Sequence, residues 1–369
     1  MDLFIWLFLL IVFLCWLSGW VVSARFRTVP KLAPGAPKPF VKVSVIIPAR
    51  DEEENLGRLL PSLEEQDFTA HEIIVVNDQS TDNTAGLASE NGARVINGEA
   101  LPSGWYGKPW ACQQGADAAT GDWLLFLDAD TVLEPGGLLR IAELSSDPAS
   151  VHSICPYHRV ENGYEQLSAF FNVIMILGMN AFTLKGSKAE RVGLFGQALF
   201  ISREQYDRVE GHKPVKQEVL ENFHLSRFLT AAGYTCRCYL GRGTIWMRMF
   251  PTHLGDLVAG WSKGFVSGAD NTPKSALIGI SIWLSGLIMS VVALTFIPLA
   301  SGAALLGILG LYLLGVIQSL YLFKNAGSFW IAGAIFFPIG LAFYQGVFFR
   351  ALRRRKEGGA VQWKGRDVT

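Results

Sequence analysis

The chain has 369 residues, 32 Lys and Arg balanced by 32 Asp and Glu, 50% hydrophobic residues and a mean hydropathy of +0.29. A neutral chain lacks the basic excess of a nucleic-acid-binding protein, and this much apolar surface exceeds what a water-soluble enzyme of this size buries. The composition therefore excludes nucleic acid as a partner and favours an integral membrane protein.

The first hydrophobic stretch, residues 3–22, holds no charge and has the length of a membrane-spanning helix, about 20 residues. Basic residues follow this stretch and none precedes it, the reverse of the order in a cleaved signal peptide. We therefore expect a retained transmembrane anchor over residues 1–24 and a linker over residues 25–40. The domain that follows is expected in the cytoplasm.

Short apolar runs alternate with helical patterns in the region after the linker. The predicted strands cover residues 42–48, 72–77, 94–96 and 123–127, and the predicted helices cover residues 51–66, 83–91 and 110–119. Strands that alternate with helices predict an α/β domain, built on a mainly parallel sheet with helices on both faces.

Polar residues follow these strands at the sheet edge where ligands of parallel sheets bind: Asp51, Asn77, Asp78, Asp128 and Asp130. Asp128 and Asp130 stand one residue apart after a buried strand, so their negative charges call for a cation such as Mg²⁺ or Mn²⁺. Such a cation commonly bridges to a diphosphate and stabilises a departing phosphate. Two aspartates in a turn can also be solvated or capping residues, and these residues alone leave both interpretations open.

Further hydrophobic segments lie in the second half of the chain. Residues 164–184 are apolar but interrupted by Asn172 and Asn180, which favours a helix lying along the membrane interface. The runs 276–299, 303–323 and 329–349 are each long enough to cross, and they predict a bundle over residues 274–350 with a basic tail over 351–369.

The last run creates a conflict in topology. Four crossings in total would place the basic tail outside the cell, whereas basic residues flanking spans stay inside. Pro338 and Gly340 interrupt the run at 329–349. We therefore hypothesise that this segment folds back instead of crossing, with its freed backbone groups buried in protein.

Four segments carry a family resemblance: VSVIIPARDE at 43–52, EIIVVNDQSTD at 72–82, residues 107–122, and LFLDAD at 125–130. They occur in the order and at the spacing of the inverting family 2 glycosyltransferases, which the region 41–265 resembles. The resemblance implies a GT-A fold, which is Rossmann-like. It also implies a nucleotide-sugar donor, expected to be a UDP-sugar, and a single displacement at the anomeric carbon.

The resemblance also implies roles for individual residues. Nucleotide-sugar binding is implied for Pro48, Asp51, Glu52, Asn77, Asp78, Lys108, Asp128, Arg248, Trp261 and Lys263, and metal binding for Asp130 and Asp128. Asn77 replaces the first acid of the family's Asp-Asp pair, and Lys108 stands where a diphosphate is expected; a solvated surface lysine is the other interpretation. Leu257 and Gly260 replace the Gln and Arg of processive synthases, so a polysaccharide synthase is only an alternative.

The expected catalytic base is the point at which the chain departs from the family. An alcohol acceptor needs a general base, and the family's Glu-Asp pair is here Glu221-Asn222. Either Glu221 or Glu218 substitutes for the missing aspartate, or Asn222 is an inactivating substitution, or the acceptor is already anionic. A carboxylate acceptor, ionised above a pKa of about 4, needs no base and would yield a glycosyl ester.

A narrower resemblance rests on KPWA at 108–111, EVLE at 218–221, RM at 248–249 and GWSK at 260–263. With the membrane pattern, these segments are similar to bacterial carotenoid-acid glycosyltransferases of the diaponeurosporenoate type and to hopanoid-associated enzymes. The resemblance implies a lipid or terpenoid acceptor, contact with membrane lipids and a bacterial cell-membrane location. Gly196 and Gln197 stand where relatives shape the acceptor pocket, although a tight turn would also explain the glycine.

Neither the cysteines nor the histidines His212, His224 and His253 form a recognisable metal site. The five cysteines lack the spacing of zinc ligands or of a redox pair, so we expect reduced structural thiols. His212, His224 and His253 form no spaced ligand pair. A catalytically inactive membrane subunit remains an alternative function, because Asn77 and Asn222 replace acids.

Overall fold

The computed structural model describes residues 2–33, 35, 37–189, 192–218, 220–356, 361–363 and 366–368. The chain forms two compact units, each built from several segments of the sequence. The sheet unit comprises residues 27–158, 191–249 and 362–369, and the helical unit comprises residues 1–26, 159–190 and 250–361. The predicted domain end at residue 265 differs from this division, because residues 159–190 and those from 250 onward pack with the helical unit.

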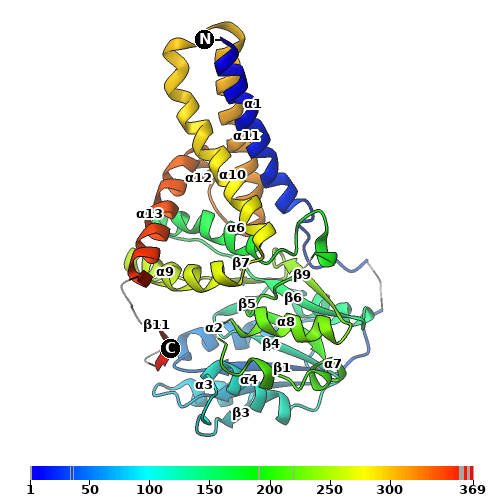
Figure 1. The fold of residues 1–369 in the computed structure, drawn as a ribbon. Coiled ribbons are helices and arrows are strands. Elements are labelled where there is room, and N and C mark those ends of the chain that lie inside the picture. The colour runs from blue at the N-terminus through cyan, green and yellow to red at the C-terminus, as the bar shows by residue number, and fades with distance from the viewer. Residues whose placement is uncertain are drawn as a thin grey trace. The chain divides into compact units, whose positions relative to one another are not determined.

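The main sheet of the sheet unit has the strand order β3-β2-β1-β4-β8-β6-β9 (Figure 1). Its strands are β1 Val43–Ala49, β2 Glu72–Asn77, β3 Arg94–Asn97, β4 Trp123–Leu127, β6 Ser150–Cys155, β8 Ala198–Ser202 and β9 Thr235–Leu240. Strands β3, β2, β1 and β4 are mutually parallel, and β8 runs antiparallel to β4 and β6. The predicted mainly parallel α/β sheet is confirmed.

Helices cover both faces of this sheet because strand side chains alternate in direction. Val45 and Ile47 of β1 join a buried cluster with Leu56 and Leu59 of α2. On the other face Gly115 of α4 lies so close to the sheet that a Cβ there would be 2.4 Å from Ile46 Cγ2. The sheet-unit helices are α2 Glu53–Glu64, α3 Thr84–Glu90, α4 Gly107–Ala118, α5 Gly137–Ala142, α7 Arg203–Arg208 and α8 Glu221–Ala231.

Three shorter strands form a second sheet in the order β5-β10-β7. They are β5 Thr131–Leu133, β7 Tyr157–His158 and β10 Ile245–Met247, and the last two strands of the chain are β11 Val361–Trp363 and β12 Arg366–Val368. Strand β5 begins one residue after Asp130, so pairing with β10 fixes the chain immediately after the two aspartates. Short 3₁₀ helices cover Glu143–Ser146, Gly163–Ser168, Gly186–Lys188, Lys213–Val215 and Leu294–Leu299.

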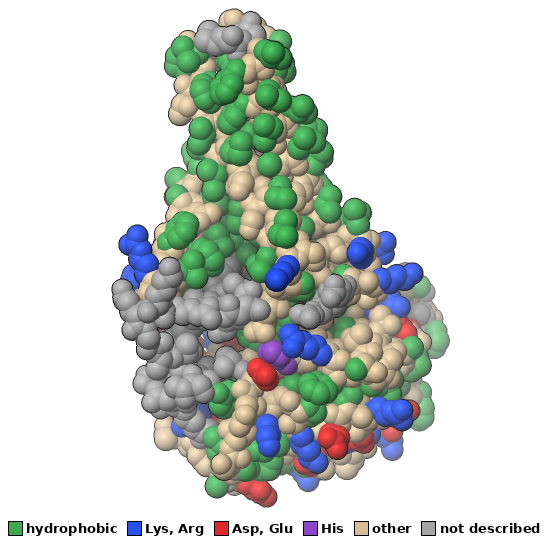
Figure 2. All heavy atoms as spheres, viewed as in Figure 1, with side chains coloured by type: hydrophobic (Ala, Val, Ile, Leu, Met, Phe, Trp, Pro, Cys, Tyr) green, Lys and Arg blue, Asp and Glu red, His purple; other side chains and the backbone are tan. Residues whose placement is uncertain are grey.

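The helical unit contains helices with apolar surfaces that face outward (Figure 2). They are α1 Asp2–Ser23, α6 Ala169–Gly178, α9 Leu254–Asn271, α10 Lys274–Ala293, α11 Gly302–Ala326, α12 Ile331–Ile335 and α13 Phe337–Lys356. Among the described residues, the stretches Leu3–Ser23, Lys274–Leu299 and Gly302–Ala326 are long and apolar enough to cross a membrane. The run predicted at 329–349 is instead divided between α12 and α13.

Side-chain hydrogen bonds connect the three long helices. Trp283 Nε1 of α10 donates to Gln318 Oε1 of α11 at 2.8 Å, and Gln318 Nε2 donates to the Trp16 carbonyl of α1 at 3.2 Å. Gly19 lies against both Trp283 and Gln318, where a Cβ would be within 2.7 Å of each. A buried amide between apolar helices is stable only when its donors and acceptors are paired, and here its partners come from both neighbouring helices.

The structure differs from the interfacial helix predicted over residues 164–184. In α6 the side chains of nine residues are buried and only Met175 is partly exposed. The buried Asn172 Nδ2 donates to the Ser168 carbonyl one turn earlier, at 3.1 Å. A helix covered by protein on all sides belongs to a core, and the apolar residues are therefore explained by burial within the helical unit.

Candidate functional site

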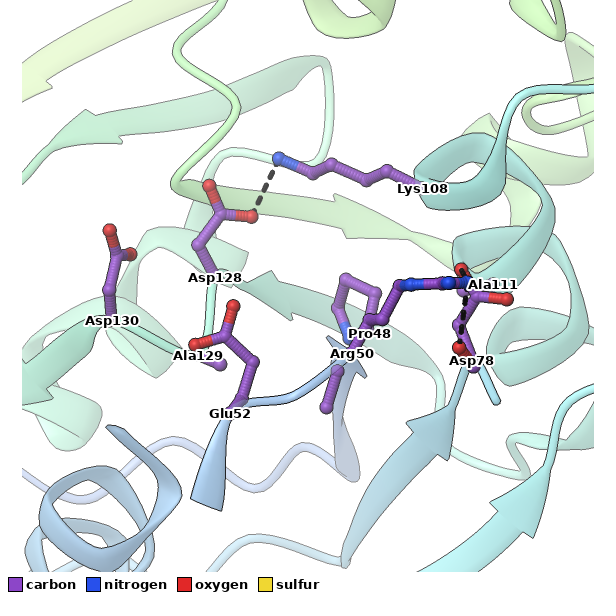
Figure 3. Close-up of a pocket in the computed structure, with 10 residues that line it drawn as sticks. Pro48, Arg50, Glu52, Asp78, Lys108, Ala111, Asp128, Ala129 and Asp130 are labelled. Atoms are coloured by element: carbon purple, nitrogen blue, oxygen red, sulfur yellow. Dashed lines mark hydrogen bonds and ion pairs between the residues drawn. The ribbon is translucent and has the colours of Figure 1, made fainter. Parts of the chain in front are cut away.

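A pocket opens at the carboxyl ends of β1, β2 and β4 (Figure 3). It is lined by Pro48, Ala49, Arg50, Glu52, Asp78, Lys108, Ala111, Asp128, Ala129 and Asp130. Six of the sequence-predicted site residues therefore lie in one pocket, in the position that the parallel strands predict. Asp51 and Asn77 follow the same strands but are not among the residues that line it.

Asp51 and Asn77 instead hold the loop after β2. Asp51 has a left-handed φ of 52°, and its Oδ1 accepts hydrogen bonds from the backbone N–H of Thr81 at 2.7 Å and from Thr81 Oγ1 at 3.1 Å. These hydrogen bonds, the backbone one foremost, lower the pKa of Asp51. Asn77 Oδ1 accepts from the Ser80 N–H at 3.1 Å. Both side chains thereby shape the rim of the pocket through the loop.

Arg50 is a pocket residue that the sequence motifs did not single out. Its Nη1 lies 3.9 Å from Asp78 Oδ2 and donates to the Asp78 carbonyl at 3.4 Å. Asp78 is only 6% exposed. This ion pair places one positive charge and one acid side by side in the pocket. In the sequence, Arg50 is marked only by its position between Pro48 and Asp51 in the motif at residues 43–52.

Lys108, in the first turn of α4, connects several parts of the site. Its Nζ lies 2.6 Å from Asp128 Oδ1, 3.4 Å from Glu221 Oε1 and 3.5 Å from the Gly196 carbonyl oxygen. Burial by itself would lower the pKa of Lys108, but the charges of Asp128 and Glu221 raise it well above its usual range. The lysine is therefore charged at neutral pH and is not a solvated surface residue.

Asp130 has the environment expected of a cation ligand. Its Oδ1 is buried and has no hydrogen-bond partner among the described residues. Burial, together with the charges of Asp128 and Glu52, raises the pKa of Asp130 to about 7. A divalent cation would relieve this repulsion and supply the missing partner.

The protein supplies only part of a metal coordination sphere here. Within the described residues, no group of three or more His, Cys, Asp or Glu side chains is placed to hold an ion. Mg²⁺ and similar hard cations often take one or two protein carboxylates and complete their shell with substrate phosphates and water. The two carboxylates of Asp128 and Asp130 fit that arrangement, and a diphosphate would fit the remaining positions.

Glu221 and Asn222 begin α8 and are 4% and 5% exposed. Asn222 Nδ2 donates to Glu221 Oε1 at 2.8 Å, the same oxygen that lies 3.4 Å from Lys108. The amide orientation is fixed by this bond, because the flipped amide would place two oxygens against each other. Asn222 Oδ1 is buried and unpaired within the described part of the chain. Glu218, the other predicted base, lies 3.2 Å from His224 Nε2 instead.

Gly196 leaves room for this cluster. A Cβ at position 196 would lie 3.1 Å from Asn222 Nδ2, 3.4 Å from Lys108 Nζ and 3.5 Å from Glu221 Oε1. Its φ is not left-handed, so close approach explains the glycine better than a tight turn does. The neighbouring Gln197 carbonyl accepts from the Asp128 N–H at 3.0 Å, which ties this segment to the aspartate loop.

The remaining predicted donor-binding residues are not among those that line the pocket. Arg248 follows β10 in the sheet unit, whereas Trp261 and Lys263 belong to α9 of the helical unit. Trp261 is 4% exposed, stacks on Phe171 at 5.1 Å and donates to Ser168 Oγ at 3.0 Å, so its side chain is part of a packed core. The side chain of Lys263 lies outside the described residues.

Comparison with known proteins agrees with this geometry. Residues 44–221 match the family model described as Glycosyl transferase family 2. The 4,4'-diaponeurosporenoate glycosyltransferase of Staphylococcus aureus strain USA300 is 31% identical over 332 residues, covering 89% of this chain and 88% of that protein. Its counterpart in strain MRSA252 matches equally.

A solved structure shows that the fold is shared as well. The mannosyltransferase PcManGT from Pyrobaculum calidifontis, in complex with GDP-Man and Mn²⁺, matches with a TM-score of 0.55 at 17% identity. The match covers 94% of this chain and 99% of that one. A likeness at this identity concerns the fold alone, and it agrees with the mainly parallel sheet. With sequence identity sustained over nine-tenths of the chain, the protein belongs to the family 2 glycosyltransferases.

Proposed function

We propose that the protein transfers a sugar, with inversion, from a UDP-sugar to a carboxylated terpenoid at the cytoplasmic face of a bacterial membrane. The observation that carries the acceptor assignment is the Glu221–Asn222 pair, in which an amide stands in place of the family's aspartate and Glu221 Oε1 is engaged by Lys108 and Asn222. The similarity to an enzyme named for diaponeurosporenoate, a carotenoid acid, supports the same assignment.

The donor end of the pocket is suited to a nucleoside diphosphate. Lys108 and Arg50 supply fixed positive charges, and the negative Asp128 and Asp130 fit a divalent cation, Mg²⁺ or Mn²⁺. When bound, such a cation neutralises charge that develops on the departing diphosphate. PcManGT, which shares the fold, was solved with Mn²⁺ and a nucleotide sugar, which supports this proposal.

The reaction needs no proton transfer when the acceptor is a carboxylate. An acceptor carboxylate oxygen attacks the anomeric carbon and forms a C–O ester bond, while the bond from that carbon to the diphosphate oxygen breaks. The diphosphate leaves with the bonding electron pair, and attack from the opposite face inverts the anomeric centre. A carboxylic acid with a pKa of about 4 is already ionised at neutral pH.

Glu221 is poorly placed to serve as the base for an alcohol. Its Oε1 lies 3.4 Å from the Lys108 Nζ and accepts a hydrogen bond from Asn222 Nδ2 at 2.8 Å. This oxygen is therefore already engaged by two donors. We assign Glu221 a positioning role, in which it holds Lys108 and Asn222 at the acceptor side of the pocket.

The ends of the three long helices support the proposed orientation. Ile5 and Leu9 of α1 share a buried cluster with Ala293 and Ala304, so the start of α1 lies beside the connection between α10 and α11. At the other end of the bundle, α1 ends, α10 begins and α11 ends. Arg25 and Arg27 follow α1 there, Lys274 is the first residue of α10, and Lys324 lies in the last turn of α11. Basic residues at one end of a bundle favour the cytoplasmic side.

The test uses the purified full-length chain in liposomes with labelled UDP-sugars and GDP-mannose, with Mn²⁺ or with EDTA. A terpenoid carboxylic acid and its matched primary alcohol are offered as acceptors. We expect labelled product only from the acid and a UDP-sugar with metal, and we expect mild alkali to release the sugar from its ester.

Other outcomes of this test would identify another function. Alkali-stable product from the alcohol alone would show base catalysis and overturn the carboxylate assignment. Label confined to a water-soluble polymer would identify a polysaccharide synthase, and absence of turnover with every donor would favour an inactive subunit.

A further inference from the structure

The apolar run at 329–349 is interrupted by its own sequence. Helix α12 ends at Ile335, Phe336 has non-helical dihedral angles, and α13 begins at Phe337 with Pro338 in its first turn. A proline in the first turn of a helix loses no hydrogen bond, but inside a continuous helix it would clash with the carbonyl of Ala334. The break therefore follows from Pro338, and it leaves carbonyl groups at the end of α12 without helical partners.

Helix α11 supplies the partner for one of these carbonyls. Tyr312 Oη donates to the Ile335 carbonyl oxygen at 2.8 Å, and the Tyr312 ring lies 5.3 Å from that of Phe337. Phe337 also lies against Gly315, where a Cβ would be 3.3 Å from the Phe337 ring. The turn between α12 and α13 is thus attached to the middle of α11 and not to either of its ends.

The chain lengths agree with a segment that returns along α11. Tyr312 lies 14 residues before Ala326, which is about 21 Å along the helix. The connection through residues 327–330 and then α12 reaches roughly 20 Å. Descending from Phe337, α13 regains the level of Ala326 after about 14 residues, near Arg350 and Arg353. Figure 1 shows α12 beside α11, and α13 running from there toward α9.

One side of this hairpin is fixed to the protein. Trp330 N–H donates to Gln166 Oε1 at 2.9 Å, and Ser328 Oγ accepts from the Val160 N–H at 2.8 Å. Further along, the Tyr344 ring of α13 lies 5.1 Å from Phe171 of α6. The Trp330 N–H, at the start of α12, therefore has a partner, as backbone at membrane depth requires.

The other side of the hairpin is apolar and exposed. Ile335, Phe336 and Ile339 are 43%, 59% and 64% exposed, and Leu313 of α11, beside Tyr312, is 56% exposed. The exposed side chains of Ile335, Phe336 and Ile339 form an apolar stripe. This stripe is continuous with the outward apolar surface of α11, a helix long enough to cross a membrane. Arg350 and Arg353 are exposed where α13 reaches the level at which α11 ends.

We infer that α12 and α13 form a re-entrant hairpin whose exposed apolar residues insert into the acyl chains of the leaflet on the side where α11 ends at Ala326. Its turn, pinned by Tyr312, reaches about half the length of α11. The hairpin enters and leaves on one side, so within the described part of the chain the crossing helices are α1, α10 and α11. This removes the conflict over the basic tail, and it requires no particular sugar or acceptor.

A nitroxide label attached to Phe336→Cys, in protein held in lipid nanodiscs, tests whether lipid, water or protein surrounds this residue. Unmutated protein treated with the same label gives the background signal of the native cysteines. Leu313→Cys is the matched lipid-facing control and Arg353→Cys the aqueous control. We expect the ratio of oxygen to nickel-chelate collisions at 336 to match that at 313 within about twofold and to exceed that at 353 about tenfold. Frequent nickel collisions at 336 would place the hairpin in water. Low accessibility to both reagents would show that a second protein copy covers it, and either result overturns the inference.

Sidedness provides an independent test in sealed, oriented vesicles. Asn325→Cys and Arg353→Cys flank the hairpin, and Ser301→Cys marks the opposite end of α11. We expect an impermeant maleimide to label 325 and 353 from the same side, and 301 from the other. Labelling of 325 and 353 from opposite sides would mean that residues 329–349 span the bilayer. Neither readout depends on enzymatic activity, so failure of the proposed function would leave both tests intact.

Discussion

The ammonium of Lys108 lies 2.6 Å from Asp128 Oδ1, and this contact joins the two halves of the site. Asp128 follows the central strand β4, whereas Lys108 also reaches Glu221 at the start of α8. One side chain thereby links the region that we propose binds the diphosphate to the residues that we propose face the acceptor. Its position in the first turn of α4, packed closely on the sheet, limits its movement.

Replacing Lys108 with Met should lower kcat/KM by about 100-fold or more, because a positive charge beside the leaving diphosphate is lost. The carboxylates of Asp128 and Glu221 would also lose their shared cation, so the melting temperature should fall. Lys108→Arg keeps the charge and should retain more activity and stability. Nucleoside diphosphate release and thermal unfolding measure both effects. Unchanged turnover in Lys108→Met would contradict this role.

Asp130→Asn should abolish metal-dependent turnover, with a loss of about 100-fold or more, while the fold persists. The melting temperature should not fall, because the variant removes a buried charge that Asp128 and Glu52 repel. Asp122→Asn is the matched control, since Asp122 is exposed and precedes β4 at its opposite end. Mn²⁺ binding in the presence of nucleoside diphosphate is read by electron paramagnetic resonance. Full activity with unaltered Mn²⁺ binding would remove the ligand assignment.

Asn222→Asp distinguishes the two kinds of acceptor. The variant is nearly isosteric but adds a negative charge beside Glu221, which should reduce kcat/KM for a carboxylate acceptor about tenfold or more by repulsion. The same variant should not impair transfer to an alcohol, because it restores the acid that the family places there. Competition between the acid and its matched alcohol measures the ratio of the two kcat/KM values directly. A variant that turns over the carboxylate faster than the native enzyme would refute the anionic-acceptor proposal.

Gly196→Ala should lower activity about tenfold or more without unfolding the protein. The added methyl group would lie 3.1 Å from Asn222 Nδ2, closer than an ordinary contact, so the amide that donates to Glu221 must shift. Gly57→Ala in α2 is the control, because its Cβ would meet only Leu87 at an ordinary 3.8 Å. That control should keep activity and gain up to about 1 kcal/mol of stability. Equal activity in both variants would argue against the close-packed cluster.

His212 should make the protein less stable in acid. It is 1% exposed, its Nδ1 lies 2.7 Å from Tyr206 Oη, and burial together with the charge of Lys108 lowers its pKa to about 3. The unfolded chain takes up a proton below a pKa of about 6.5 that the folded protein does not. The stability that neutral His212 provides is therefore present above pH 6.5 and decreases as the pH falls toward 3.

This effect of His212 should amount to about 2 kcal/mol at pH 5 relative to neutral pH. His212→Gln removes the titrating group, so the variant should be less stable at pH 7 but should lose less additional stability between pH 7 and pH 5. Thermal unfolding in detergent at several pH values gives the comparison. An equal loss in both proteins over this interval would assign the acid sensitivity to other groups.

Much of the sheet unit could be predicted from local patterns. The apolar runs before Asp51, Asp78 and Asp128 form β1, β2 and β4, and their parallel pairing brings Asp78, Asp128 and Asp130 to one pocket. Hydrophobic pattern and composition identify such strands, because a buried parallel strand is a short run of apolar residues that can be recognised in the local sequence. Resemblance located Lys108, Gly196 and Glu221 but gave no distances between them.

Other features could not be derived from local patterns. Residues 164–184 are apolar whether they face lipid or protein, and only the packing of neighbouring helices around α6 distinguishes the two. Trp261 matches a family motif, but its indole is committed to Phe171 and Ser168. Arg50 gains its partner only when β1 and β2 pair, which places Asp78 beside it.

The sequence by itself determined the order of strands and helices, the charge-free stretches of membrane length and the acids that follow β4. Those properties depend on residues close together in the chain, where hydrophobic period, proline and charge act directly. Tertiary structure decided that Lys108 meets both Asp128 and Glu221, and that Tyr312 holds the turn after α12. These contacts join residues from 20 to 113 positions apart, and only the packing of whole elements brings such residues within hydrogen-bond distance.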